Sequence, residues 1–215
     1  MRLLSSDFSP YSTRVRIQIR KKSLPIDICA PEPALRTPEF LNKYPLGKIP
    51  VLELDDGRHL AESWTIMQYL EQVYPEVSLS SDDAFSVAQM SQIGRYADLH
   101  LGPSLFPMFR AVLLSLELNI DDEVAAIKAE LNKGDRLLAG QDLNRSVNIA
   151  DIALATTMFF TLETPKLFNI KNLLADYDNL NAWWQWVQKD ADVALGIDEM
   201  NRAFKGFVAA SKQAS

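Results

Sequence analysis

Residues 9–12 of this 215-residue chain read Ser-Pro-Tyr-Ser, which places three hydroxyl groups around one proline. Cysteine at both serine positions would make a dithiol, in which one thiolate attacks a disulfide and the second sulfur resolves it. Serine does neither, because its alkoxide is inaccessible at neutral pH. A hydroxyl can instead donate a hydrogen bond to a thiolate that a ligand supplies. The motif therefore indicates a site that binds and activates a thiol.

The local sequence supports this interpretation. Pro10 is placed to begin a helix, and residues 2–6 are a candidate strand directly before it. A helix N-terminus favours an anion, and so it would favour a thiolate beside Ser9, Tyr11 or Ser12. A free thiol has a pKa near ~8.5, and lowering it by about two units corresponds to ~2.7 kcal/mol. One charge-assisted hydrogen bond, at ~1.5–3 kcal/mol, is of this size.

The first third of the chain alternates short strand and helix patterns. After the first helix, residues 24–29 alternate like a strand, and residues 39–44 form a short helix beyond a proline-marked loop. Residues 49–54 and 58–60 flank an Asp-Asp-Gly turn as a hairpin, and the apolar spacing of residues 62–74 predicts another helix. The order is βαβ, helix, ββα. A strand–helix–strand crossover makes its strands parallel, so the hairpin makes the sheet mixed.

The rest of the chain shows helical patterns only. Helices are expected at residues 84–113, 121–138, 148–163, 179–190 and 193–208. We therefore expect an α/β domain at residues 1–76, with a mixed four-stranded sheet, and an all-α domain at residues 84–215. Asn148 and Asp151 have the spacing of a capping box, which concerns folding rather than chemistry.

Composition limits the classes of function. The single cysteine, Cys29, excludes an intrachain disulfide, and one cysteine with two histidines argues against a metal site. No apolar run reaches the ~18 residues of a membrane span. The net charge of −6 falls entirely in residues 79–215, and an acidic surface argues against nucleic acid as a partner. We expect a cytoplasmic protein without a nucleic-acid or membrane partner, and we interpret the basic cluster at residues 14–22 as a solvated helix face.

Three motifs in this order resemble the cytosolic glutathione S-transferase family. Residues 9–12 follow the first strand as the thiol-handling segment does in thioredoxin-like folds, and KIPVLEL, at 48–54, resembles the loop and strand that hold a cis-proline. DDGRHLAESWTIMQYLEQVYP, at 55–75, resembles the family's hairpin, Glu-Ser pair and third helix. The resemblance spans the chain and favours a bacterial member of serine type or of no assigned class. It implies a thioredoxin-like first domain and glutathione as co-substrate.

The resemblance also assigns residues to a glutathione site. Pro50 would be the cis-proline, and the backbone of Ile49 or Val51 would pair with the cysteinyl backbone of glutathione. Glu62 and Ser63, at a helix N-terminus, would hold the ammonium and carboxylate groups of the γ-glutamyl end.

Lys48 would meet the glycine carboxylate of glutathione. For the hydroxyl that activates the thiol, the serine-type classes favour Ser9, followed by Ser12 and then by Tyr11. The SSC signature of the zeta class is absent, although RVRI is shared with it. For the second substrate, the resemblance indicates the helix that faces the cleft between the domains, with Tyr96, His100 and Phe106.

The leading hypothesis is a glutathione S-transferase whose bound thiolate attacks a small apolar electrophile. Two alternatives stay open: a glutathione-dependent peroxidase or disulfide reductase, and a non-catalytic interaction module like the stringent starvation proteins. The resemblance also implies a twofold homodimer, with apolar side chains near 64–74 and 85–96 at the core of the contact. In that dimer the basic first-domain helix would face the acidic second domain of the partner.

Overall fold

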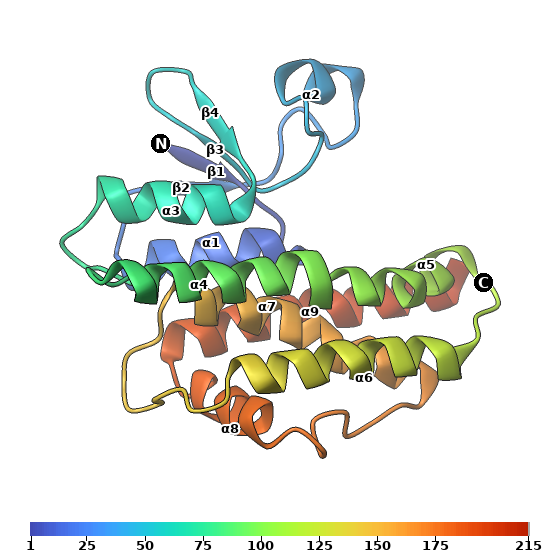
Figure 1. The fold of residues 1–215 in the computed structure, drawn as a ribbon. Helices are drawn as coiled ribbons and strands as arrows, with labels where there is room; N and C mark the ends of the chain where they lie inside the picture. Colours follow the sequence, from blue (N-terminus) through green and yellow to red (C-terminus); the bar gives the residue numbers. More distant parts are fainter. Residues whose placement is uncertain (215) are drawn as a thin grey trace.

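The computed structural model describes residues 1–214, with side chains through residue 211, and begins with a four-stranded sheet (Figure 1). The sheet order is β2-β1-β3-β4. Its strands are β1 (Arg2–Leu4), β2 (Asp27–Cys29), β3 (Val51–Glu53) and β4 (His59–Ala61). β1 pairs with β2 in parallel, whereas β1–β3 and β3–β4 are antiparallel. The expected mixed sheet is confirmed.

Three helices accompany the sheet: α1 (Pro10–Lys21), α2 (Pro38–Lys43) and α3 (Ser63–Val73). Proline opens both α1 and α2, because its missing N–H is not needed in a first turn. In Figure 1, α1 and α3 lie between the sheet and the helical bundle, whereas α2 stands away from the bundle. The expected order βαβ, helix, ββα is confirmed.

The rest of the described chain is helical. Its elements are α4 (Ala84–Tyr96), the π-helical turn η1 (Ala97–Leu101), the 3₁₀ turn η2 (Pro103–Leu105), α5 (Phe106–Leu114), α6 (Ile120–Leu137), α7 (Ile149–Glu163), the 3₁₀ turn η3 (Pro165–Phe168), α8 (Asp178–Val187) and α9 (Ala191–Ala214). We propose that the first domain ends at residue 76 and the second begins at residue 84, because α3 ends at Val73 and α4 begins at Ala84. Within residues 1–214, no helix combines the length and the apolar character needed to cross a membrane.

α7 is the central helix of the bundle, and residues 149–161 are all buried. A helix that is apolar all round has to be covered all round. The predicted capping box starts it: the Asn148 side chain accepts from the N–H of Asp151 at 3.0 Å, and the Asp151 carboxylate accepts from the N–H of Asn148 at 2.9 Å. The Trp183 indole also donates to Asp151, at 3.0 Å, so α8 is tied to the start of α7.

α1 is buried between the sheet and the bundle, where it packs against α3, α7 and α9. Its basic cluster is therefore not a solvated face, and that interpretation was wrong. Arg16 donates to Glu199 of α9 at 3.0 Å, Arg20 pairs with the same carboxylate, and Lys22 lies 3.1 Å from Glu71. Sequence reasoning missed these pairs because the partners lie up to 183 residues away along the chain.

Candidate functional site

A cleft of roughly 570 Å³ opens between the first domain and the α4–α5 segment. Its walls come from the start of α1, the loop after β2, the loop before β3, the start of α3, and the chain from α4 into α5. The cleft brings together seven of the residues expected from the sequence, namely Tyr11, Lys48, Ile49, Pro50, Glu62, Ser63 and Phe106.

Tyr11 brings two donors to the cleft, its phenol and its backbone N–H. Pro10 has no N–H, and the N–H of Ser12 already bonds the Ser9 hydroxyl at 3.2 Å. The Tyr11 N–H is therefore the first free donor of α1. A Cβ added at Gly102 would lie 3.3 Å from the phenol oxygen, so that glycine lets η1 approach Tyr11 closely.

Electrostatics keep the Tyr11 phenol protonated. Burial raises the pKa of Tyr11, and the negative charges of Asp98 and Glu62 raise it further. The Arg14 guanidinium, 5.0 Å from the ring centroid, acts in the opposite direction but does not reverse the shift. At neutral pH the phenol is therefore a hydrogen-bond donor rather than a base.

Ser9 and Ser12 do not line the cleft. Ser9 is the N-cap of α1, and its hydroxyl accepts the N–H of Ser12. Ser12 is completely buried, and its hydroxyl has no partner among the described residues. The expectation that the Ser12 hydroxyl could reach the ligand was therefore wrong, whereas Ser9 is half-buried.

The Ile49–Pro50 peptide bond is cis, as expected. Ile49 lines the cleft, and neither its N–H nor its C=O has a hydrogen-bond partner within the described chain. Val51 does not reach the cleft, because it is buried inside the sheet between Leu4 of β1 and Ala61 of β4. The expectation that the Val51 backbone could bind the ligand is therefore wrong. Ile49 is the residue whose backbone can pair with an extended peptide.

Glu62 and Ser63 form the turn from β4 into α3. Glu62 has φ 67°, a positive value that is uncommon for a residue with a side chain. Its exposed carboxylate makes no capping bond, so it is open to the cleft rather than used by the helix. Ser63 is buried, and the free N–H groups of the first turn of α3 follow from it. This geometry suits a ligand with adjacent ammonium and carboxylate groups.

Arg14 is a residue of the site that sequence reasoning missed. Its guanidinium is completely buried behind the cleft, where it donates to Asp98 at 2.7 Å and to the Ser63 hydroxyl at 3.4 Å. The same group donates to the C=O of Ala153 and to the hydroxyl of Thr157, each at 3.1 Å. Arg14 thereby joins α1, α3, η1 and α7 directly behind the ligand-facing residues.

The mouth of the cleft combines free cations with exposed apolar side chains. Arg36 and Lys48 have no ion-pair partner among the described residues. The large apolar side chains at the mouth are more than a third exposed; they are Leu35, Leu46, Leu99 and Phe106. Sequence reasoning also missed Leu35 and Arg36, which line the cleft. Their position in a proline-marked loop was the signal in the sequence that could have indicated them.

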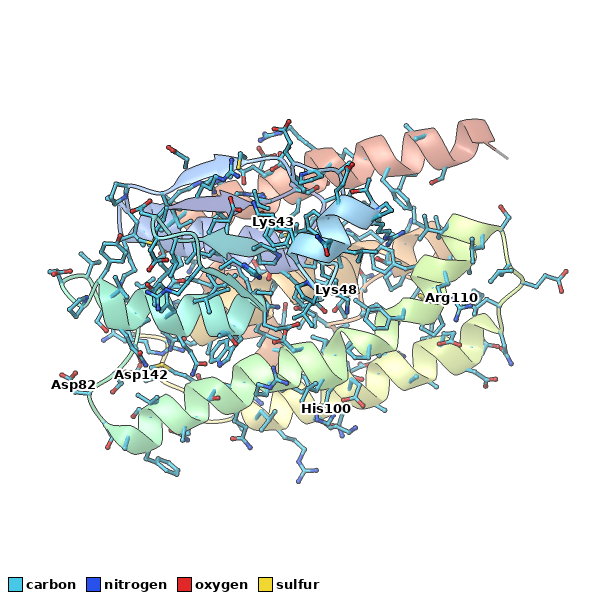
Figure 2. All side chains as sticks on the ribbon, turned by 90° about the horizontal axis from the view of Figure 1, so that it is seen from above. Lys43, Lys48, Asp82, His100, Arg110 and Asp142 are labelled. Atoms are coloured by element: carbon cyan, nitrogen blue, oxygen red, sulfur yellow. The ribbon has the colours of Figure 1, made fainter. Side chains whose placement is uncertain are left out.

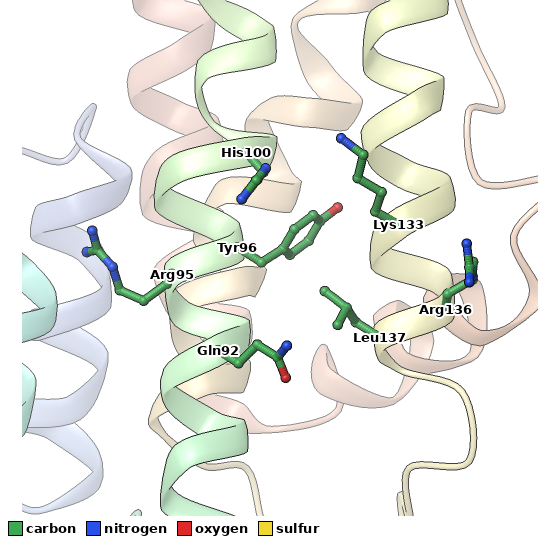
Figure 3. Close-up of a pocket in the computed structure, with 7 residues that line it drawn as sticks. All are labelled: Gln92, Arg95, Tyr96, His100, Lys133, Arg136 and Leu137. Carbon is green, nitrogen blue, oxygen red and sulfur yellow. The ribbon is translucent and has the colours of Figure 1, made fainter.

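Tyr96 and His100 do not face the cleft, which corrects their assignment to the second substrate. Tyr96 is buried and its hydroxyl donates to the C=O of Glu130 in α6 at 2.7 Å. Figure 3 shows the Tyr96 ring directed toward α6, and His100 Nδ1 lies 3.9 Å from the Glu130 carboxylate of α6. Figure 2 shows His100 and Lys48 on opposite sides of α4. Asp98 and Leu99, in the π-helical turn η1, line the cleft instead.

Comparisons with known proteins agree with this geometry. Residues 3–78 match the model of the glutathione S-transferase N-terminal domain. A glutathione S-transferase-like protein of Gibberella moniliformis is 30% identical over 176 residues, covering 74% of this chain and 73% of that protein. A probable chloroplastic glutathione S-transferase of Oryza sativa is 30% identical over 173 residues, covering 79% of this chain but 55% of that protein. The chain thus spans about half the length of the rice relative.

A solved structure shows the same fold over nearly the whole chain. It is a glutathione S-transferase of Methylobacterium radiotolerans in complex with glutathione sulfonate, with a TM-score of 0.73 and 24% identity. The superposition covers 91% of this chain and 93% of that one. The thioredoxin-like first domain and helical second domain are therefore confirmed as the fold.

Proposed function

Because this chain belongs to the glutathione S-transferase family, we propose that its cleft binds glutathione and activates the thiol for attack on a small apolar electrophile. The observation that carries this proposal is the convergence on one cleft of a peptide-pairing backbone at Ile49, a helix N-terminus at Ser63 and a protonated phenol at Tyr11. A solved relative holds glutathione sulfonate, which supports the ligand class.

The residues of the cleft fit each part of glutathione. Ser63 and the free N–H groups of α3 receive the γ-glutamyl carboxylate, while Glu62 receives the ammonium group. The backbone of Ile49 pairs with the cysteinyl unit. Lys48 and Arg36 supply the positive charge for the glycine carboxylate.

Tyr11 is the residue that we propose for thiol activation. Its phenol and its N–H can both donate to the glutathione sulfur, and each donated bond favours the thiolate over the thiol. The thiolate then attacks the electrophile, forming a carbon–sulfur bond while the leaving group departs with its electron pair. Ser9 stays the alternative donor, because its hydroxyl hydrogen is not used by its capping role.

The charges of the cleft favour an uncharged acceptor. Arg14, Arg36, Lys48 and Arg95 are cationic, whereas Glu62 and Asp98 are anionic, which leaves an excess of two positive charges. Glutathione thiolate carries two carboxylates, one ammonium and one thiolate, so its net charge of −2 balances this excess. No cation remains for an acidic acceptor, and the mouth of the cleft carries exposed apolar side chains.

A glutathione-dependent reductase or peroxidase is the second candidate reaction. Cys29 ends β2 and does not line the cleft, so glutathione would have to supply the attacking thiol in any disulfide exchange. Parallel assays with an aryl halide, a peroxide and a mixed disulfide separate these reactions. We propose the aryl halide as the preferred substrate, because the mouth of the cleft is apolar.

Isothermal titration calorimetry with glutathione tests the proposal. We expect saturable binding at or below millimolar concentration, and we expect Glu62→Gln to weaken it about tenfold through loss of one charged hydrogen bond. Glu76→Gln is the matched control, because Glu76 is an exposed carboxylate of the linker outside the cleft. Absence of heat with millimolar glutathione would contradict the proposed function.

A further inference from the structure

The cleft-facing side of α5 continues beyond the cleft as an exposed apolar face. Phe106 lines the cleft, and Leu113 follows it by seven residues, which is almost two helical turns, so both side chains lie on the same face of α5. Both are more than half exposed, whereas Met108 and Ala111, on the other side of the helix, are buried. The rise of an α-helix places Leu113 about 10 Å beyond Phe106.

This face extends past the first domain. Figure 1 shows α5 projecting beyond α1 and the sheet. Leu114 and Leu116 add exposed apolar side chains at the end of the helix. From residue 99 to residue 116, Arg110 is the only lysine, arginine, aspartate or glutamate in the sequence. A continuous apolar surface of this kind, unlike exposed apolar residues that are scattered singly, marks a site that binds an apolar molecule or another protein.

The proposed thiol site lies at the inner end of this face. Gly102 approaches the Tyr11 phenol so closely that an added Cβ would lie 3.3 Å from the phenol oxygen. Leu113 is eleven residues beyond Gly102, which corresponds to about 17 Å along the helices. A molecule that reacts beside Tyr11 therefore reaches Phe106 with a short chain, and it reaches Leu113 with an unbranched chain of roughly twelve carbons at this helical rise.

We propose that the preferred acceptor is a small electrophilic group on a long unbranched alkyl chain, and that this alkyl chain lies along α5 with its end at Leu113. The inference rests on the proposed glutathione transfer: the glutathione sulfur forms the bond to the electrophilic carbon, and the leaving group departs with its electron pair. The apolar face removes methylene groups from water, and Leu113 thereby determines which chain lengths are favoured. Continuity with the cleft favours a substrate over a second protein, because a protein seated on Phe106 would cover the mouth of the cleft.

Calorimetric titration of the full chain with glutathione and with its S-hexyl and S-dodecyl thioethers tests the inference, because each thioether is the product of transfer to an alkyl acceptor. The dodecyl thioether, used below the concentration at which it forms micelles, should bind about tenfold or more tightly than the hexyl thioether, since its further methylene groups contact α5. Glutathione binding with equal affinities for the two thioethers overturns this inference and leaves the proposed function standing. Absence of glutathione binding overturns both.

A substitution at Leu113 tests the location. Leu113→Asp should reduce the dodecyl-to-hexyl affinity ratio to about threefold or less, because it places a charge where the alkyl chain ends. Leu113→Met keeps an apolar side chain of similar volume and should retain the wild-type ratio. Leu195→Asp is the matched control: Leu195 is an exposed leucine of α9 outside the cleft, so the ratio should not change.

Circular dichroism verifies that these variants are folded. A wild-type ratio in Leu113→Asp overturns the proposal. So does a monomeric Leu113→Asp beside a dimeric wild type, because that result would assign the face to a second copy of the chain.

Discussion

At the N-terminus of α1, three neighbouring hydroxyl groups have three different environments. Ser9 caps the helix, Ser12 is completely buried, and Tyr11 lines the cleft together with Glu62. Tyr11 lies two residues after the N-cap Ser9, and its long side chain reaches the cleft. Pro10, between them, has no hydroxyl group. The chemical role therefore depends on the direction of each side chain rather than on its hydroxyl group.

We expect Tyr11→Phe to raise the pKa of the bound glutathione thiol and to lower kcat/KM about 10- to 100-fold. The reason is the loss of one hydrogen bond to a charged group, which contributes ~1.5–3 kcal/mol. Ultraviolet absorbance of the thiolate against pH measures the first effect. Ser9→Ala is the matched variant: it should lower stability by about 1 kcal/mol through loss of the cap, with a smaller effect on the thiol pKa. The reverse ranking of the two thiol pKa values would assign activation to Ser9.

Ser12→Ala should leave the free energy of unfolding unchanged or raise it by up to about 1 kcal/mol. The buried Ser12 hydroxyl has no partner in the described chain, so its removal relieves an uncompensated desolvation. Thr13→Val is the matched control, because the Thr13 hydroxyl donates to the C=O of Ser9 and accepts from Arg16, each at 3.0 Å. Urea denaturation measures both variants. A loss of stability in Ser12→Ala as large as that in Thr13→Val would refute this prediction.

At the scale of elements, Arg14 ties four segments together. We expect Arg14→Met to lower the free energy of unfolding by about 3 kcal/mol or more, since it leaves the largely buried Asp98 carboxylate without its main partner. Arg110→Met, at an exposed position of α5 (Figure 2), should change stability by less than about 0.5 kcal/mol. Thermal and urea unfolding of both variants check this. Similar stability losses in the two variants would contradict the prediction.

The ion pair between Lys43 of α2 and Glu53 of β3 should make the stability of the fold depend on pH in the acid range. Burial of Glu53 opposes its ionisation, but hydrogen bonds from Lys43, Tyr44 and Arg2 outweigh burial and lower the pKa of Glu53 to about 2 from 4.5. A lowered folded-state pKa stabilises the fold above pH 4.5, and that contribution is lost as the pH falls from 4.5 toward 2. Its size is on the order of 1 kcal/mol, because Lys43 and Arg2 are about half exposed and solvent screens them.

Urea denaturation from pH 2 to pH 7 measures this contribution. Glu53→Gln should be less stable than the wild type at pH 7, and the difference should shrink below pH 4.5. Asp56→Asn is the matched control, because Asp56 pairs with Arg58 within one exposed turn. A stability difference between Glu53→Gln and the wild type that stays constant with pH would contradict the assignment.

Local patterns predicted the elements well, because each depends on nearby residues. The strands, the helices and the Asn148 cap all follow from periodicity, prolines and short-range hydrogen bonds. The side of α4 that faces the cleft was not predictable, because the π-helical turn at Ala97–Leu101 changes the helical phase within the site. The partners of Arg14 were not predictable either, since Asp98 and Thr157 lie 84 and 143 residues away.

At the scale of the whole molecule, we propose a homodimer held by apolar contact. Exposed apolar side chains gather along α3, the linker and α4, at Val73, Val77, Phe85 and Val87. This is the region expected for the contact, and apolar surface of this kind marks interaction sites. The expected attraction between a basic helix and the partner's acidic domain is corrected. Arg16 and Arg20 of α1 are paired with Glu199 of α9 in the same chain, and Arg14 is paired with Asp98.

Light scattering should therefore give a mass near twice 24.2 kDa that persists in about 1 M salt, because apolar contacts are not screened. Phe85→Asp should give a monomer, since Phe85 is 69% exposed in the single chain. Leu113→Asp is the matched control, with 60% exposure at a different place, the end of α5. A wild-type monomer at micromolar concentration would refute the homodimer.

The placement of Arg14 and Arg16 has a consequence for the autonomy of the first domain. Arg14 donates to Asp98, Ala153 and Thr157, and Arg16 pairs with Glu199 as well as with the exposed Asp7. The largely buried carboxylates that pair with these two arginines, Asp98 and Glu199, therefore come from the other half of the chain. A fragment that ended near residue 80 would carry two guanidinium groups on a surface shaped for burial. The first domain is therefore not a transferable module. Any chimera that exchanges it between relatives has to bring the matching positions of η1, α7 and α9 with it.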